Sequence, residues 1–115
     1  MELALDVDGA GRFVCRLEGD GRQATVTASN LNAAEDLLAA LEDARDGGYG
    51  ECFWEEQGGE YRWMFRRGDD AALTVVVLWS TGTLTGWEHV FRAAADLDAL
   101  VAQVRSGLRR EGLAR

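Results

Sequence analysis

One histidine and two cysteines are the side chains in this sequence with the widest range of chemistry. His89 lies between Trp87 and Phe91, and the alternation predicts that these three residues share one face of a strand. An imidazole there can act as a general acid or base, or it can form a hydrogen bond within a sheet. Because a catalytic base needs an orienting partner that the sequence does not identify, we favour the structural interpretation and assign no catalytic residue.

The cysteines do not indicate a metal site. Cys15 and Cys52 are far apart and share a single histidine, so cysteine and histidine alone cannot assemble a zinc site. Each alternates with apolar residues, which is typical of a small buried hydrophobic side chain. The motifs of common hydrolases, phosphate loops, zinc proteases and calcium loops are also missing. We therefore predict no metal and no cofactor, and favour a binding protein over an enzyme.

The spacing of apolar side chains predicts the elements that position these residues. Alternation, or a short apolar run between turns, predicts strands over 2–8, 12–18, 23–28, 51–56, 61–67, 72–79 and 86–92. Helical spacing predicts helices over 31–46 and 97–110. Runs of strands that each end in one helix indicate an α+β fold. We predict one domain over 1–115, with a single antiparallel sheet of about six or seven strands, order βββα-ββββα, and both helices on one face.

Local signals mark the ends of the helices. Asn32, with Glu35 three residues later, predicts a capping box, and Gly47 with Gly48 predicts the end of that helix. Asp96 predicts the cap of the second helix.

The two halves of the chain also echo each other. The aligned residues are Phe13, Cys15, Leu17, Thr25 and Val26 in the first half, and Tyr61, Trp63, Phe65, Thr74 and Val75 in the second. Such an echo can mark a duplicated unit of strands and helix, although alternation also arises independently.

Negative charge is concentrated in the first half of the chain, which has a formal net charge of −8 overall. Residues 1–57 carry 4 arginines and 13 acids, whereas residues 58–115 carry 8 arginines and 7 acids. The predicted first helix bears an acidic stripe in which Arg45 is the only cation. The stripe consists of Glu35, Asp36, Glu42, Asp43 and Asp46. It would attract a basic protein and repel nucleic acid and membranes, although surplus acid also serves plain solubility.

An aromatic hairpin is the most distinctive segment. Its alternation places four aromatic side chains on one face, which we expect to be core because the helices need an apolar sheet face to cover. They are Trp54, Tyr61, Trp63 and Phe65. Were such aromatics exposed beside Arg62, Arg66 and Arg67, they would form a base-stacking platform for single-stranded nucleic acid.

The opposite face of the predicted sheet is also partly apolar. Its apolar members are Phe53, Met64, Val76, Leu78 and Val90, with Arg62 and Arg66 among them. A solvent face would alternate to polar residues, so a second copy of the chain, a protein partner or a helix is expected to cover this group. An apolar centre with arginine around it has the composition of a protein interface.

These observations favour a non-enzymatic protein-interaction module, which binds a partner through the acidic helix and the apolar sheet face or self-associates. In general appearance, a small acidic α+β chain with tryptophan-rich strands resembles bacterial immunity proteins and small secretion chaperones, which implies an inhibitor-like or chaperone-like role. One alternative is a single-stranded nucleic-acid binder. Another is a small-molecule binder or enzyme with a pocket around His89 and Trp63, Trp79 or Trp87. The sequence predicts no signal peptide or membrane span, so we expect a cytoplasmic protein.

Overall fold

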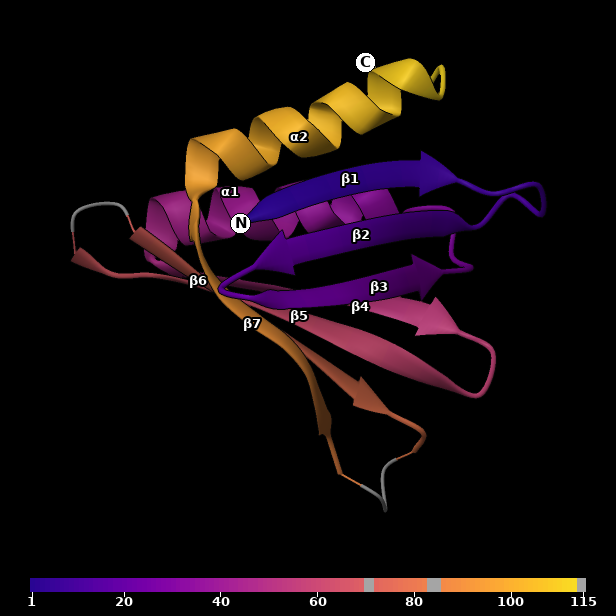
Figure 1. Cartoon of the computed structure of the whole chain (residues 1–115), viewed down its shortest axis with the longest axis horizontal. Coiled ribbons are helices and arrows are strands. Elements are labelled where there is room, and N and C mark those ends of the chain that lie inside the picture. Colours follow the sequence, from indigo (N-terminus) through magenta and orange to yellow (C-terminus); the bar gives the residue numbers. More distant parts are fainter. Residues whose placement is uncertain (70–71, 83–85, 114–115) are drawn as a thin grey trace.

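The computed structural model describes residues 1–69, 72–82 and 86–113 and contains two antiparallel sheets (Figure 1). The elements are β1 (Glu2–Val7), β2 (Phe13–Gly19), β3 (Arg22–Ala28), α1 (Ala33–Gly47), β4 (Tyr49–Glu56), β5 (Gly59–Arg67), β6 (Ala72–Ser80), β7 (Glu88–Asp96) and α2 (Leu97–Arg110). One sheet has the order β1-β2-β3 and the other β4-β5-β6-β7. The α+β class and the element order are confirmed, but the prediction of a single sheet is wrong.

The sheets stay separate because β3 contacts both edge strands of the four-stranded sheet instead of pairing with one. At the turn before β3, the Asp20 carboxylate accepts a hydrogen bond from the Ala94 N–H of β7 at 3.1 Å. Just after β3, the Ser29 N–H donates to the Glu55 carbonyl of β4 at 2.8 Å. A strand that reaches both edges runs across the sheet and cannot extend its ladder. The alternation of apolar residues in the sequence shows which side chains share a face of a strand. It does not show that β3 crosses the larger sheet.

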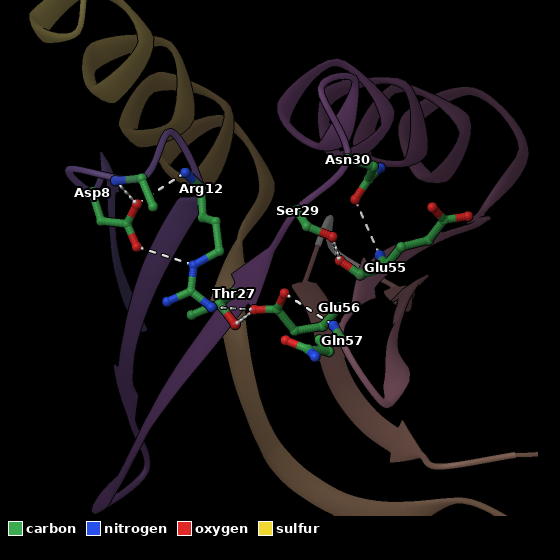
Figure 2. A network of polar contacts seen from close by, with 9 residues as sticks. Asp8, Arg12, Thr27, Ser29, Asn30, Glu55, Glu56 and Gln57 are labelled. Carbon is green, nitrogen blue, oxygen red and sulfur yellow. Dashed lines mark hydrogen bonds and ion pairs between the residues drawn. The ribbon is translucent and has the colours of Figure 1, made fainter.

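A polar network joins the two sheets at one end (Figure 2). The Arg12 guanidinium donates to Asp8 at 3.1 Å and to Glu56 at 3.0 Å, and the Thr27 hydroxyl donates to the same Glu56 carboxylate. The backbone N–H of Arg12 holds the pKa of Asp8 below its usual range. These residues bond one another, so we interpret the network as a structural clamp between the β1–β2 connection, β3 and β4.

Each helix packs against strands of the other half of the chain. Helix α1 contacts β4 and β5, where the Trp54 Nε1 donates to the Ala33 carbonyl at 2.9 Å. Gly50 permits this approach, since a Cβ there would lie 1.9 Å from the Ala40 carbonyl oxygen. Helix α2 instead contacts β1 and lies on the side of the small sheet away from the larger one (Figure 1). The prediction that both helices cover one face of one sheet is therefore wrong.

Helix α2 closes the free edge of β1. Side chains of the helix and of Glu111 just after it bond the backbone of every second strand residue. Gln103 accepts from Leu3 N–H at 2.7 Å, Glu111 accepts from Val7 N–H at 3.3 Å, and Arg110 donates to the Leu5 carbonyl at 3.1 Å. Gly107 lets the helix approach, because a Cβ there would lie 2.6 Å from the Leu5 carbonyl oxygen. This edge therefore offers no unpaired row of backbone groups to another chain.

The buried apolar residues of both sheets and both helices form one cluster. Trp54, Trp63 and Phe65 of the aromatic hairpin are fully buried in it, which confirms that this face is core, and Tyr61 is half-buried at its margin. The Trp63 Nε1 has no hydrogen-bond partner among the described residues. None of the described helices is long and apolar enough to cross a membrane.

Two of the three predicted helix signals are confirmed. The Asp96 carboxylate accepts from Ala99 N–H at 2.9 Å, and Gly48 ends α1 in the left-handed conformation. The capping box at Asn32 is wrong, because the Asn32 side chain makes no capping hydrogen bond. The helix begins at Ala33, so Leu31 lies before it and is 87 % exposed instead of joining the apolar stripe.

A β-bulge changes the predicted faces of β7. Val77 lies opposite Phe91, but its neighbour Leu78 lies opposite His89, so Val90 is an extra residue. Phe91 is buried on the inner face, whereas His89 shares the outer face with Leu78. The prediction that Phe91 and His89 share a face is therefore wrong. Val90 packs against the core and leaves the outer apolar group to which it was assigned.

Candidate functional site

The candidate site is the outer face of the four-stranded sheet, opposite the face that α1 covers. Three rows of cross-strand neighbours form it: Phe53, Arg62, Leu78 and His89; Glu51, Met64, Val76 and Arg92; and Tyr49, Arg66, Thr74 and Ala94. Trp87, just before β7, adds an indole beside Phe53. Tyr49, Phe53 and Trp87 are 40 %, 40 % and 39 % exposed, so large aromatic side chains face solvent here.

An ion pair at the centre of the outer face holds the aromatic side chains in place. The Arg62 guanidinium donates to Glu51 from Nε at 2.9 Å and from Nη2 at 2.7 Å, and the Tyr49 hydroxyl donates to the same carboxylate at 3.1 Å. The guanidinium carbon lies 5.9 Å from the Phe53 ring centroid and 5.8 Å from that of Trp87. The two rings are 6.3 Å apart and tilted by 43°. Arg62 therefore stacks with both rings while Glu51 fixes its direction.

The charge states of Glu51, Arg62 and Tyr49 support the hydrogen bonds among these three side chains. The hydrogen bond from Arg62 lowers the pKa of Glu51, and the same bond raises the pKa of Arg62. Burial, followed by the hydrogen bond to Glu51, raises the pKa of Tyr49. At neutral pH, Glu51 and Arg62 are thus charged while Tyr49 keeps its proton, the states that their hydrogen bonds require.

The outer face also carries two arginines without an ion-pair partner among the described residues, Arg66 and Arg92. The guanidinium of Arg66 lies 5.9 Å from the Tyr49 ring centroid. Glu51 is already paired with Arg62, so these two arginines make the end of the face around Tyr49 and Val76 positive, whereas Glu55 and Glu60 lie at its other end, beyond Phe53. This sign is opposite to that of the whole chain, whose formal net charge is −8.

The structure brings together most of the residues predicted for this face. Those that lie on it are Phe53, Met64, Val76, Leu78, Arg62 and Arg66, and the bulge removes Val90. Two members of the site, Tyr49 and Trp87, were not predicted from the sequence. Extending the alternation of β4 back from Glu51 would have found Tyr49, whereas no local pattern placed Trp87 beside Phe53.

The predicted acidic stripe of α1 is exposed but is divided by its surroundings. Glu42 lies 3.7 Å from Arg105 of α2, and Arg45 bonds Asp98 of α2 at 2.6 Å. Arg45 is therefore not the only cation near this helix. Asp36 lies on the other flank, near β4, where its charge adds to the larger effect of burial in raising the pKa of Cys52. Asp43 follows two turns later on the same flank, and Glu35 and Asp46 complete the exposed stripe.

The remaining reactive side chains do not form a second site. His89 is exposed and lies on the opposite face of the sheet from Trp63, so the structure does not bring them into one pocket. Cys15 and Cys52 are buried and free, and burial strongly raises the pKa of both thiols, so they are inert at neutral pH. Within 1–69, 72–82 and 86–113, no cluster of three or more histidine, cysteine or acidic residues could hold a metal ion.

A cleft of about 320 Å³ lies between the N-terminal half of α1 and the C-terminal half of α2. Leu38 and Leu108 contribute to its apolar lining, and Glu35, Arg105 and Arg109 contribute charged groups. These groups are not arranged for nucleophilic or acid–base chemistry, and the opposed charges favour no particular ligand. The outer face therefore remains the stronger candidate.

Comparisons of this chain with protein-family models, with curated proteins and with solved structures find no match.

Proposed function

We propose that this chain is a non-enzymatic protein-interaction module that docks a partner protein on the outer face of its four-stranded sheet. The observation that supports this most directly is the exposure of Tyr49, Phe53 and Trp87 on a face that no described helix or strand covers. Soluble proteins rarely leave a contiguous apolar patch open unless it binds something. Aromatic residues, methionine and arginine are also the types that protein interfaces favour.

The rigidity of the aromatic group adds to this argument. Binding normally costs free energy because flexible side chains must be immobilised. Phe53 and Trp87 are already held by Arg62, and Arg62 by Glu51, so much of that cost is met before a partner arrives. These residues would be the energetic anchors, with Met64, Val76 and Leu78 completing the contact. A toxin, a secretion substrate or a second copy of the chain could occupy such a face.

Both cysteines are free thiols, which suits a reducing compartment, so we place this module in the cytoplasm.

The test replaces the anchors by the double substitution Phe53→Ser and Trp87→Ser. We expect self-association measured by light scattering, or a protein captured from the source cell by the wild type, to be lost in this variant. Val14→Ser, on the outer face of the other sheet, is the matched control and should retain the association. Equal association of the wild type and the double variant would contradict the proposal.

A second candidate is single-stranded nucleic acid, which one observation favours. Arg66 and Arg92 lie on the same face as the exposed aromatics and have no ion-pair partner among the described residues. Aromatic stacking with arginine contacts to phosphate is how such strands are bound without sequence preference. Quenching of tryptophan fluorescence by an oligothymidylate, weakening steeply with salt, would support this candidate over the protein partner. The charge of −8 opposes it.

A further inference from the structure

The edge strand β4 exposes unpaired backbone groups in its middle. The Glu55 N–H donates to the Asn30 side chain at 3.0 Å, and its carbonyl accepts from the Ser29 N–H at 2.8 Å, so both groups point away from β5 (Figure 2). Backbone groups alternate in direction along a strand, so those of Glu51 and Phe53 also point away from β5. No described residue bonds these outward groups.

This opening differs from the treatment of the other sheet's edge. Two side chains of α2, with Glu111 just after the helix, bond every second residue of β1 from Leu3 to Val7. Edge strands that stay open in native proteins are places where another strand can add. The middle of β4 is therefore suited to receive a strand, and β1 is not.

Acidic side chains line this edge from both sides. Helix α1 runs along β4, with Ala33 beside Trp54 and Ala40 beside Gly50. Asp36 and Asp43 lie on the flank of α1 next to this strand, and both are exposed. On the strand itself, the exposed Glu55 side chain projects to the outer face, where Glu51 is already paired with Arg62.

We propose that β4 accepts an extended, basic peptide segment of another protein as an added strand. The outward N–H and carbonyl groups of Glu51 and Phe53 would bond its backbone, and Asp36 and Asp43 would face its basic side chains. A second copy of β4 fits less well, because its own Asp36 and Asp43 would lie near these carboxylates and repel them. The inference goes beyond outer-face docking, since it depends on the strand backbone and on α1.

The experiment measures binding of labelled eight-residue peptides to the whole chain by fluorescence anisotropy. The probe alternates arginine and valine, and one control peptide alternates glutamate and valine. A second control has the sequence of the probe with every backbone amide N-methylated, so its charge is unchanged but its backbone amides cannot donate hydrogen bonds. We expect the probe to bind at least about tenfold more tightly than either control.

Two pairs of substitutions test the acidic flank. Asp36→Asn with Asp43→Asn should weaken probe binding about fivefold, because two charges facing the peptide are removed. Glu42→Gln with Asp46→Asn removes the same charge from other positions of the same helix, with Glu42 on the flank toward Arg105 of α2, and should change binding less than twofold. All four side chains are exposed, and circular dichroism checks that each variant keeps its helix.

Equal binding of the probe and its N-methylated form would overturn the proposal, since only non-specific charge attraction would remain. Equal weakening by the two pairs of substitutions would overturn it as well. Trp87→Ser separates this inference from the proposed function, because it removes an outer-face side chain beside Phe53 and leaves every backbone group of β4 in place. Probe binding that survives Trp87→Ser, while partner docking does not, assigns the two activities to two surfaces.

Discussion

The outer faces of the two sheets differ in composition although both sheets are antiparallel and bury their inner faces. The three-stranded sheet presents exposed polar and small side chains, among them Ala4, Arg16 and Thr25, and Arg16 pairs there with Asp6. The four-stranded sheet presents three exposed aromatic side chains instead. Their edges differ too, because α2 closes β1 whereas the middle of β4 stays open. The outer face of the four-stranded sheet departs from the polar pattern that is usual for a solvent-exposed face. A binding role would explain this departure.

This contrast separates features that stabilise the fold from those available for binding. The polar outer face adds little to stability or association, since exposed ion pairs contribute at most about 1 kcal/mol each. The aromatic outer face exposes apolar area that would be more stable if covered. Four predictions test the contrast, in order of expected effect.

The largest effect is expected where each sheet meets its helix. Gly50→Ala places a Cβ 1.9 Å from the Ala40 carbonyl oxygen and should lower the free energy of unfolding by about 3 kcal/mol. Gly107→Ala, with 2.6 Å to the Leu5 carbonyl oxygen, should cost about 1 kcal/mol, because alanine's helix propensity offsets part of the clash. Urea unfolding followed by tryptophan fluorescence measures both changes. Gly9→Ala is the control with open space, and a cost as large there would contradict the prediction.

The second prediction concerns the edge of β1, where a substitution removes one of the contacts that close it. Gln103→Leu removes the acceptor of the Leu3 N–H and should lower the free energy of unfolding by about 1 kcal/mol. It should also increase self-association in light scattering at high protein concentration, because β1 then exposes a backbone donor. Gln23→Leu, on the exposed surface of β3, is the control of the same residue type. Similar self-association of both variants would show that added apolar surface, and not the edge, is responsible.

The third prediction concerns stability at the outer face. The double substitution Phe53→Ser and Trp87→Ser should change the free energy of unfolding by less than about 1 kcal/mol, because both side chains are partly solvated in the folded state. Thermal unfolding measures this. A loss of several kcal/mol would mean that these side chains serve the fold, and that the two outer faces differ less than we propose.

The smallest effect is the pH dependence of the Glu51–Arg62 pair. Because Arg62 lowers the pKa of Glu51 in the folded state, the pair stabilises the protein above the unfolded-state pKa of Glu51. This stabilisation is lost as the pH falls through the lowered folded-state pKa. Glu51→Gln should therefore cost about 0.5 kcal/mol at neutral pH, after allowance for solvent screening, and less in acid.

A double-mutant cycle tests this prediction. In an Arg62→Gln background, Glu51→Gln should lose most of its pH-dependent cost, because the partner that lowers the pKa is gone. A cost that is unchanged in that background would assign it to the hydrogen bond from Tyr49 instead.

Much of the candidate site could be predicted because β4 and β5 form a tight hairpin. Such a hairpin determines which residues lie opposite each other, and the alternation then shows which of them share a face. Phe53 lies opposite Arg62, and Glu51 opposite Met64, as the short turn between β4 and β5 requires. The exceptions have physical causes. The bulge at Val90 reverses the alternation in β7, and the position of Trp87 depends on a contact with a strand more than thirty residues earlier.

The order of strands and helices, the buried aromatic face and the outward set around Met64 and Val76 were determined by the sequence itself, because they depend on local periodicity and short turns. Only the tertiary structure decided that there are two sheets, that each helix packs on the other half, and that β1 is closed while β4 stays open. Periodicity states which side of a strand is apolar, but it does not state which distant segment will cover that side. Contacts such as Gln103 with Leu3 and Ala40 with Gly50 decide that, and they exist only once the chain has folded.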